Sequence, residues 1–240
     1  MSARQSPRRR LFVHVGLQKT GTSYLQGVML RNRDVLAAQG LDLVPATKRE
    51  SFHLMLDVRN RYAPGRDPES VATSLERFEA DLATAPGARA LYSQESLAAC
   101  RPGQVERFLA ACGDREVHVV ATVRDLSRQL PSSWQQELKA GRDVSYDAYL
   151  DRLREQQREG SGSHPWIHLD PPAVLARWAA FLPPEQVHVV TVPPPGSPVT
   201  LLMERFCRVL EVDPARLEPE EKPGNTSLGR VQAEVLRRVT

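Results

Sequence analysis

Residues 11–26 read Leu11-Phe12-Val13-His14-Val15-Gly16-Leu17-Gln18-Lys19-Thr20-Gly21-Thr22-Ser23-Tyr24-Leu25-Gln26. A short apolar run, a loop bounded by two glycines and an amphipathic segment follow one another, which predicts a strand, a phosphate-binding loop and a helix. The first amides of a helix have no partners within it, and its dipole is positive at that end, so a phosphate is stabilised there. Gly16 and Gly21 allow the backbone to turn tightly and to approach a ligand closely.

The position of the lysine separates this loop from the loop of nucleoside triphosphate-binding proteins. Their loop reads G-x-x-x-x-G-K-[ST], with the lysine directly after the second glycine. Here Gly16 and Gly21 have that separation, but Thr22 occupies the lysine position and the lysine lies inside the loop, at Lys19. The pattern therefore indicates a phosphate cradle that is a poor match for an ATPase or a kinase.

The stretch from His14 to Gln26 resembles the 5′-phosphosulfate loop of the sulfotransferases that use 3′-phosphoadenosine 5′-phosphosulfate (PAPS). The usual form in that family is P-K-[ST]-G-[ST]-[ST], and this chain has glutamine where proline is common. In the alternative interpretation, the stretch is a plain strand–turn–helix whose hydroxyls have no function. The resemblance implies that PAPS is bound by Gln18, Lys19, Thr20, Gly21, Thr22 and Ser23.

The resemblance also assigns tasks within the loop. The amides from Thr20 to Ser23, with the hydroxyls of Thr22 and Ser23, are expected to hold the 5′-phosphate. Lys19 is expected to contact the oxygen between phosphate and sulfur, where negative charge grows as that bond breaks. A compact ammonium suits such a point contact with phosphate oxygens.

A second motif follows the apolar segment 117–123 and reads Arg124-Asp125-Leu126-Ser127-Arg128-Gln129-Leu130-Pro131-Ser132-Ser133-Trp134. Sulfotransferases carry R-D-P-x-x-x-x-x-S after a strand, and the resemblance implies that Arg124 and Ser132 bind the 3′-phosphate of PAPS. The planar donors of arginine suit paired bonds with phosphate oxygens. Leu126 replaces the usual proline, and Pro131 is expected to bend the helix that contains Ser132. Taken alone, Arg124 and Asp125 also fit a surface turn.

Apolar segments and helical patterns alternate along the chain. The segments predicted to be strands are 11–15, 41–44, 90–93, 117–123 and 187–192. Helices are predicted from Thr22 to Gly40, over 69–84, from Pro102 to Gly113, from 124 to about 140, and over 146–157, 173–181, 201–210 and 228–239. This order predicts an α/β fold of the P-loop type, with three layers, a central parallel sheet flanked by helices, and ligands at the carboxyl ends of the strands.

A sulfuryl transfer needs a group that removes the proton of the acceptor. Glu95 follows the predicted strand 90–93, so it belongs where ligands gather. Glutamate serves as the base in several carbohydrate and protein sulfotransferases, and this resemblance makes Glu95 the first candidate for the catalytic base, beside Lys19. The alternative role for Glu95 is a carboxylate that complements a helix dipole. His53 is the second candidate base, in a segment that can reach over the loop, whereas His14 is expected to be a core histidine.

The composition fits one globular domain with a sizeable core. The chain has 240 residues, of which 41% are hydrophobic and 25% are charged. The formal net charge is +3, and four arginines between residues 4 and 10 alone supply four positive charges. The basic character therefore belongs to the N-terminus, and no nucleic-acid partner is expected. Residues 1–10 are therefore predicted to be a flexible basic tail, and residues 11–240 to be the sulfotransferase domain.

Several other features bear on class and location. The cysteines Cys100, Cys112 and Cys207 have no metal-ligand spacing; we expect buried thiols, with a Cys100–Cys112 pair as the alternative, and no metal site. No apolar run suits a membrane-spanning helix or a signal peptide, so we expect a cytoplasmic protein with no stable membrane insertion. Residues 225–230 also resemble bacterial members of the family. The last helical pattern reaches Thr240 without a cap, and we expect the natural protein to continue there.

The acceptor is not specified by the sequence. A hydroxyl or an amine of a carbohydrate, a lipid-linked sugar or a phenolic small molecule fits, and the oligomeric state is open. Segments 47–68 and 141–172 are expected to form the walls of the acceptor site, with Trp134, Trp166 and Tyr146 as candidate stacking surfaces. Two rival hypotheses remain: a small-molecule kinase with a modified P-loop, which predicts magnesium-dependent ATP binding, and a non-catalytic, nucleotide-binding remnant of a sulfotransferase.

Overall fold

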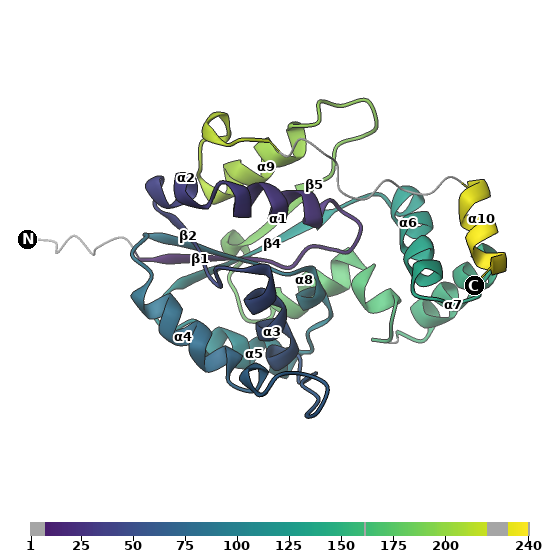
Figure 1. Ribbon diagram of the computed structural model, residues 1–240, viewed down its shortest axis with the longest axis horizontal. Helices are drawn as coiled ribbons and strands as arrows, with labels where there is room; N and C mark the ends of the chain where they lie inside the picture. The colour runs from purple at the N-terminus through teal and green to yellow at the C-terminus, as the bar shows by residue number, and fades with distance from the viewer. Residues whose placement is uncertain (1–7, 161, 220–229, 240) are drawn as a thin grey trace, which may run out of the picture.

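A five-stranded parallel sheet forms the centre of the fold (Figure 1). The structure is a computed structural model that describes residues 8–160, 162–219 and 230–239. Within these residues the strands are β1 (Arg10–His14), β2 (Leu41–Leu43), β3 (Arg89–Ser93), β4 (Glu116–Val123) and β5 (Val187–Thr191), in the spatial order β2-β3-β1-β4-β5. The predicted α/β fold with a central parallel sheet is confirmed, and each predicted strand is present.

β1 lies between β3 and β4 and pairs with both of them in parallel register. Leu11 is opposite Ala90 of β3 and Val117 of β4. The carboxyl ends of three neighbouring strands therefore meet at one edge of the sheet, which is called the carboxyl edge below. Ligands of open parallel sheets bind at such an edge. The segments that leave β1, β3 and β4 are the ones that contain the glycine loop, Glu95 and Arg124.

Alternate residues of the strands face opposite layers of helices. Leu11 and Val13 pack into one apolar cluster and Phe12 into another, as the two-residue repeat of a strand requires. The first cluster includes residues of α3 (Lys48–Val58), α4 (Ser74–Thr84), α5 (Pro102–Ala110) and α8 (Pro171–Ala179), and the second includes residues of α1 (Thr22–Arg31), α2 (Arg33–Ala38) and α9 (Leu201–Leu210). Figure 1 shows the two groups of helices on opposite sides of the sheet.

Three further helices form a lobe beside the sheet, at the right of Figure 1. They are α6 (Leu126–Lys139), α7 (Tyr146–Arg158) and α10 (Arg230–Val239), and they enclose a third apolar cluster. Trp134 is buried in this cluster, its indole N–H donates to the Val144 carbonyl at 2.8 Å, and its ring lies 5.3 Å from that of Tyr146. Trp134 therefore belongs to the core of the lobe and does not offer a stacking surface to a ligand.

The chain divides at Asn32 where one continuous helix was predicted from Thr22 to Gly40. Asn32 is almost fully buried, and its side-chain amide donates to the Val28 carbonyl at 2.8 Å. The same side chain bonds to the backbone carbonyl and amide of Glu218, at 2.9 and 2.7 Å. The prediction of a single helix was wrong because the asparagine side chain competes with the helical backbone and ties the break to a distant segment.

α3 lies in the segment 47–68, for which no helix was predicted. The Thr47 hydroxyl accepts from the Glu50 amide at 3.2 Å, and the Glu50 carboxylate accepts from the Thr47 amide at 3.1 Å. This capping box is readable as T-x-x-E before an apolar run, so the sequence carried a signal for the helix. The next predicted helix, over 69–84, begins instead at Ser74, after a short 3₁₀ turn, η1 (Glu69–Val71).

The remaining short elements are η2 (Glu95–Ala99), η3 (Trp166–His168), η4 (Pro184–Gln186) and η5 (Pro214–Arg216). Arg10, which was predicted to belong to the tail, is the first residue of β1, and its guanidinium pairs with Glu211 at 2.6 Å. The rest of the predicted tail up to residue 7, most of the segment 225–230 and Thr240 lie outside the described residues.

The three cysteines are buried free thiols, as predicted. Burial raises the pKa of Cys100, Cys112 and Cys207 to about 12, so these thiols stay protonated and unreactive at neutral pH. Across the described parts of the chain, every helix is too short or too polar to cross a membrane.

Two buried histidines make the fold sensitive to acid. Burial is the main cause that lowers the pKa of both His14 and His168 to about 3. Below about pH 6.5 the unfolded histidines bind protons while the folded ones stay neutral, so unfolding is favoured as the pH falls toward 3. We expect each histidine to lower the free energy of unfolding by about 1.4 kcal/mol per pH unit over most of this range.

Urea denaturation at a series of pH values from about 7.5 to 4.5 measures this dependence. The His14→Asn substitution should reduce the loss per pH unit by the share of one histidine, whatever it costs in stability at neutral pH. An unchanged slope in the variant would contradict the assignment of the acid sensitivity to His14.

Candidate functional site

The glycine loop, Val15–Gly21, continues the sheet before it turns. The amides of Val15 and Leu17 donate to the carbonyls of Val120 and Thr122 in β4, at 3.0 and 2.8 Å. Gly16 and Gly21 have positive φ angles of 69° and 88°, and Lys19 has one of 64°. The left-handed conformation is unusual for a residue with a Cβ, and residues held in it concentrate at functional sites.

The space around the two glycines explains why no larger residue occurs there. A Cβ on Gly16 would lie 2.6 Å from the Cβ of Glu95 and 3.0 Å from its Cα. A Cβ on Gly21 would lie 2.6 Å from a methyl carbon of Leu202 in α9. The loop is therefore packed between the backbone at Glu95 on one side and α9 on the other.

The N-terminus of α1 is arranged for an anion. Gly21 is the N-cap, no side chain caps the helix, and its first turn contains no acidic residue. Ser23 is exposed and Thr22 is buried in this turn. The first amides of the helix are thus left to a ligand, and the helix dipole favours one with negative charge.

A chain of polar side chains crosses the carboxyl edge beneath the loop. The Thr20 and Thr122 hydroxyls are 2.6 Å apart, and the His14 ring bonds to Thr122 (3.2 Å) and to the Ser93 hydroxyl (2.8 Å). Gln26 of α1 donates both to Ser93 (3.3 Å) and to Glu95 Oε2 (3.2 Å). The Thr20 hydroxyl is also bonded to the Leu17 carbonyl, so it serves the loop itself.

Lys19 lies half-buried among charges of both signs. Its Nζ donates to Gln136 Oε1 of α6 at 2.8 Å. Burial lowers the pKa of Lys19, the charge of Lys139 lowers it further, and the charge of Glu95 acts in the opposite direction. The structure therefore brings Lys19 and Glu95, two residues predicted to act together, into electrostatic contact.

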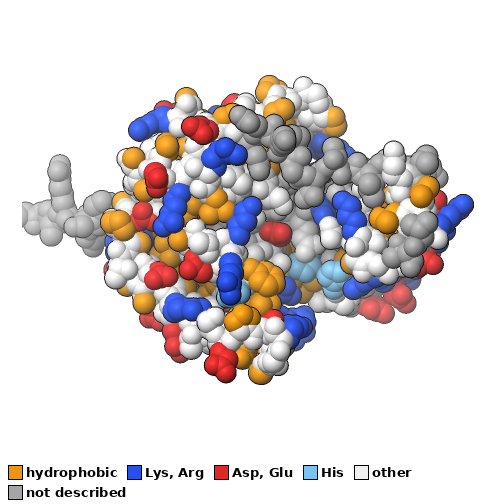
Figure 2. All heavy atoms as spheres, in the orientation of Figure 1, with side chains coloured by type: hydrophobic (Ala, Val, Ile, Leu, Met, Phe, Trp, Pro, Cys, Tyr) orange, Lys and Arg blue, Asp and Glu red, His pale blue; other side chains and the backbone are white. Residues whose placement is uncertain are grey.

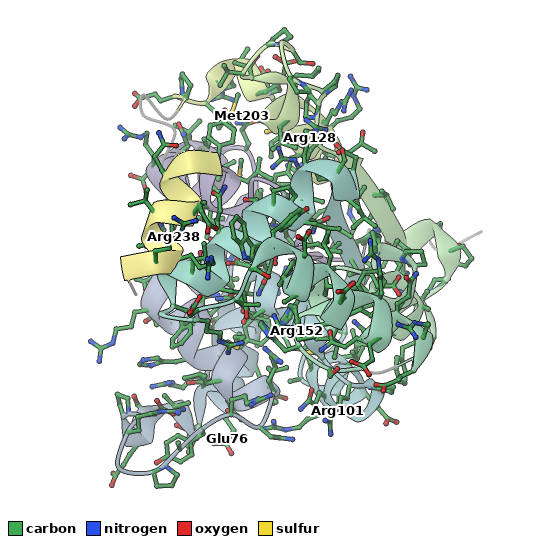
Figure 3. The ribbon with its side chains drawn as sticks, turned by 90° about the vertical axis from the view of Figure 1, so that its right-hand side faces the viewer. Glu76, Arg101, Arg128, Arg152, Met203 and Arg238 are labelled. Atoms are coloured by element: carbon green, nitrogen blue, oxygen red, sulfur yellow. The ribbon has the colours of Figure 1, made fainter. Side chains whose placement is uncertain are left out.

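Arg124 joins the second motif to the loop. Its Nη1 donates to the Lys19 carbonyl at 3.3 Å, whereas its Nε is buried with no hydrogen-bond partner. Burial lowers the pKa of Arg124, and the charge of Arg128 adds to this effect. Asp125 has a structural part, because it caps α6 by accepting from the Arg128 amide at 3.0 Å and pairs with the Arg128 guanidinium. Figure 3 labels Arg128 at this end of the lobe.

Two glutamines that the sequence analysis did not select brace the loop from α6. Gln129 is fully buried and donates to the Gln18 carbonyl at 2.7 Å, and Gln136 holds Lys19. Ser132 lies three residues after Gln129 and four before Gln136, so helical spacing puts all three side chains on the same, loop-facing side of α6. The sequence therefore carried a signal for the two glutamines, in their spacing from Ser132. Pro131 does not end the helix, because α6 continues through it to Lys139.

The two candidate bases differ in their positions. Glu95 opens η2 directly after β3, packs against Gly16 and is held by Gln26. His53 lies in the middle of α3, where its charge contributes to a lowered pKa of Asp67. Among the described residues, no hydrogen bond or ion pair joins His53 to the glycine loop. The geometry therefore associates Glu95 with the loop more closely than His53.

A cavity of about 210 Å³ opens at the end of β3, beside Ser93 and Gln94, the two residues that precede Glu95 in the chain. Its wall is largely apolar, with polar groups that include Gln26, Ser93 and Gln94. The complete lining is Gln26, Met29, Leu30, Leu43, Pro45, Lys48, Ser51, Phe52, Leu91, Ser93 and Gln94. Three of these residues belong to the segment 47–68, which was expected to form a wall of the acceptor site.

Within the described chain, no group of three or more His, Cys, Asp or Glu side chains is arranged to hold a metal ion.

Comparison with known proteins supports the fold. No family model and no curated protein matches the chain. The structure is similar to the crystal structure of a sulfotransferase from Alicyclobacillus acidocaldarius, with a TM-score of 0.52 and 19% sequence identity, over 95% of this chain and 90% of that chain. At this identity the likeness concerns the three-layer architecture, and the chemistry has to be argued from the site.

The packing at Gly16 leads to a stability prediction. The Gly16→Ala substitution places a Cβ in a left-handed conformation, at about 1–2 kcal/mol, and against Glu95, at about 1–3 kcal/mol. We expect the free energy of unfolding, measured by urea denaturation, to fall by about 2–5 kcal/mol. The control is Gly103→Ala in the first turn of α5, where a Cβ meets no atom within 4 Å; it should leave stability unchanged or raise it. Equal effects of the two substitutions would contradict the proposed contact.

Proposed function

We propose that this chain is a sulfotransferase that transfers a sulfuryl group from PAPS to a hydroxyl or an amine of an acceptor. The observation that carries the proposal is the hydrogen bond from the Arg124 guanidinium, at the end of β4, to the Lys19 carbonyl in the loop after β1. Two anion-binding devices, a helix N-terminus with a lysine and a guanidinium, are thus adjacent at one edge of the sheet. A nucleotide with separate 5′ and 3′ phosphates requires such a pair.

The residues present fit this donor. Arg124 has a buried Nε without a partner, and the first amides of α1 have no side-chain cap. The pKa values of Lys19 and Arg124 are lowered by burial and then by the like charges of Lys139 and Arg128, and a bound anion would relieve both effects. The similarity in fold to a sulfotransferase supports the same proposal.

The glycine loop would bind one phosphate of PAPS, the 5′-phosphate that carries the sulfuryl group to be transferred. The second motif would bind the other, the 3′-phosphate. We expect the amides of residues 20–23 and the hydroxyls of Thr22 and Ser23 to hold the 5′-phosphate. Thr20 would contribute its amide alone, because its hydroxyl is already bonded to Leu17 and Thr122. Arg124 and Ser132 would hold the 3′-phosphate.

Glu95 is proposed to accept the proton of the acceptor. Its Oε2 accepts from Gln26, and its Oε1 has no hydrogen bond within the described residues, so Oε1 is the atom to which the proton would move. The adjacent cavity would hold the acceptor with its hydroxyl near this oxygen. Lys19, kept in place by Gln136, would stabilise the negative charge on the departing phosphate, because a charge in a half-buried site acts more strongly than in water.

The donor site can be tested by calorimetric titration of adenosine 3′,5′-bisphosphate without metal. We expect Lys19→Ala and Arg124→Ala each to weaken binding about 10- to 100-fold, the effect of losing charge-assisted hydrogen bonds to phosphate. Arg31→Ala is the matched control, since Arg31 is an exposed cation at the far end of α1, about 15 Å from the loop. Absence of binding, together with magnesium-dependent binding of ATP, would overturn the proposal in favour of a kinase.

The catalytic base can be tested by transfer of radioactive sulfate from PAPS to a panel of phenols and sugars. Glu95→Gln should lower turnover by about 10²- to 10⁴-fold, the usual contribution of a general base. Its affinity for the bisphosphate should stay close to that of the wild type. His53→Gln should retain turnover, and the reverse pattern would assign the base to His53. Binding of the bisphosphate by the wild type without any transfer would favour the non-catalytic remnant.

A further inference from the structure

A group of arginine and histidine side chains lies around η2 and η3. We call it the η3 basic cluster: Arg59 and Arg61 after α3, His164 and His168 around η3, and Arg177 of α8. Arg177 Nη2 donates to the Ala98 carbonyl of η2 at 2.6 Å and to the Ile167 carbonyl of η3 at 3.0 Å. The His164 and His168 rings are 5.6 Å apart, edge to face. The cluster is therefore attached to η2, the element that Glu95 begins.

The cluster has more positive than negative charge. The charges that act on its two histidines come from five arginines and one carboxylate, Glu137, whose Oε1 lies 3.9 Å from His164 Nδ1. A second carboxylate, Asp170, acts on Arg177. Glu137 is already paired with Arg142 (2.8 Å) and Arg152 (3.1 Å) of the lobe, and Figure 3 labels Arg152 on α7. Figure 2 shows histidine side chains beside Lys and Arg side chains where the lobe meets the body that contains the sheet. The positive charge on this side of η2 is thus only partly balanced.

Two members of the cluster, one buried and one half-buried, lack the partners that such groups need. His168 is 4% exposed, and its Nδ1 has no hydrogen-bond partner. The half-buried Arg59 guanidinium has no hydrogen bond or ion pair to any described residue. Burial lowers the pKa of Arg59, Cys100 acts in the opposite direction, and the charge of Arg61 lowers it again. A buried charge is costly unless it is paired, so an anion would be stabilised here.

We propose that the η3 basic cluster binds an anionic group of the acceptor, a carboxylate or a phosphate, while the hydroxyl to be sulfated lies at Glu95. The inference rests on the proposed function and names its substrate class. Arg177 donates to the Ala98 carbonyl of η2, the short 3₁₀ element that begins at Glu95, so the cluster and Glu95 are joined through one element. A hydroxyl and an anionic group occur together on one sugar ring in a uronic acid or a sugar phosphate. Arginine is the residue best adapted to both anions.

The test compares acceptors that differ only in charge. The probes are p-nitrophenyl β-glucuronide and p-nitrophenyl β-glucoside, titrated by calorimetry into the full chain with adenosine 3′,5′-bisphosphate present and absent. The glucuronide should bind at least about tenfold more tightly than the glucoside, the effect of a charge-assisted bond to arginine. Glucose 6-phosphate, compared with glucose, tells whether the cluster prefers phosphate to carboxylate.

Variants locate the binding. Arg59→Gln and Arg61→Gln should each reduce the preference for the anionic sugar about tenfold, with bisphosphate affinity unchanged; Arg61 is exposed, so its substitution should not disturb folding. Arg49→Gln, at the other end of α3, is the control and should keep the preference. Equal affinities for the charged and neutral sugars, no binding of either, or a preference that survives both cluster variants would overturn the inference. Failure of the proposed function is a separate result, because it appears as loss of bisphosphate binding in the wild type.

Discussion

A side chain at residue 16 has no room, because its Cβ would lie 2.6 Å from the Cβ of Glu95. Gly16 and Glu95 pack this closely because β1 and β3 are parallel neighbours, so the segments that follow them leave the sheet side by side. This contact sets the separation between the glycine loop and η2, and so between Lys19 and Glu95. The remaining groups of the site, on β4 and α6, are positioned relative to this pair through the Lys19 backbone and side chain.

The polar side chains beneath the loop add a second constraint. Thr20, Thr122, His14, Ser93 and Gln26 form hydrogen bonds in series from the loop to Glu95, across three strands and α1. Such buried networks are rigid when every member is satisfied. The burial that keeps His14 neutral therefore serves the same arrangement that holds the loop. The η3 basic cluster differs from this network, since it contains groups without hydrogen-bond partners, which a bound anion would satisfy.

The sequence was sufficient for the sheet, the glycine loop and the association of Arg124 with it, because these depend on local patterns: apolar runs, glycine spacing and a charge at a strand end. The sequence was insufficient where a structural feature depends on contacts between segments that are far apart in the chain. The break at Asn32 depends on Glu218, and the parts played by Gln129 and Gln136 depend on the approach of α6 to the loop. The η3 basic cluster was missed for the same reason, since its members come from three elements that only the fold brings together. The position of Trp134 in the sequence suits a core residue and a ligand-stacking residue equally well. Only its packing in the apolar cluster of the lobe shows that it is a core residue.

The central position of β1 also governs when the site can form. Among the described strands β1 comes first in the chain, yet Leu11 pairs with Ala90 and Val117, and the loop amides extend the ladder to Val120 and Thr122. Contacts between residues so far apart in the chain form slowly, because a long loop must close before they are made. On the ribosome, β1 must therefore wait for its partners: β3 emerges first, and the pairing with β4, together with the loop amides on Val120 and Thr122, forms only after residue 123 has emerged. Folding of this protein in the cell is consequently exposed to aggregation through this apolar strand, in proportion to the time taken to translate that interval.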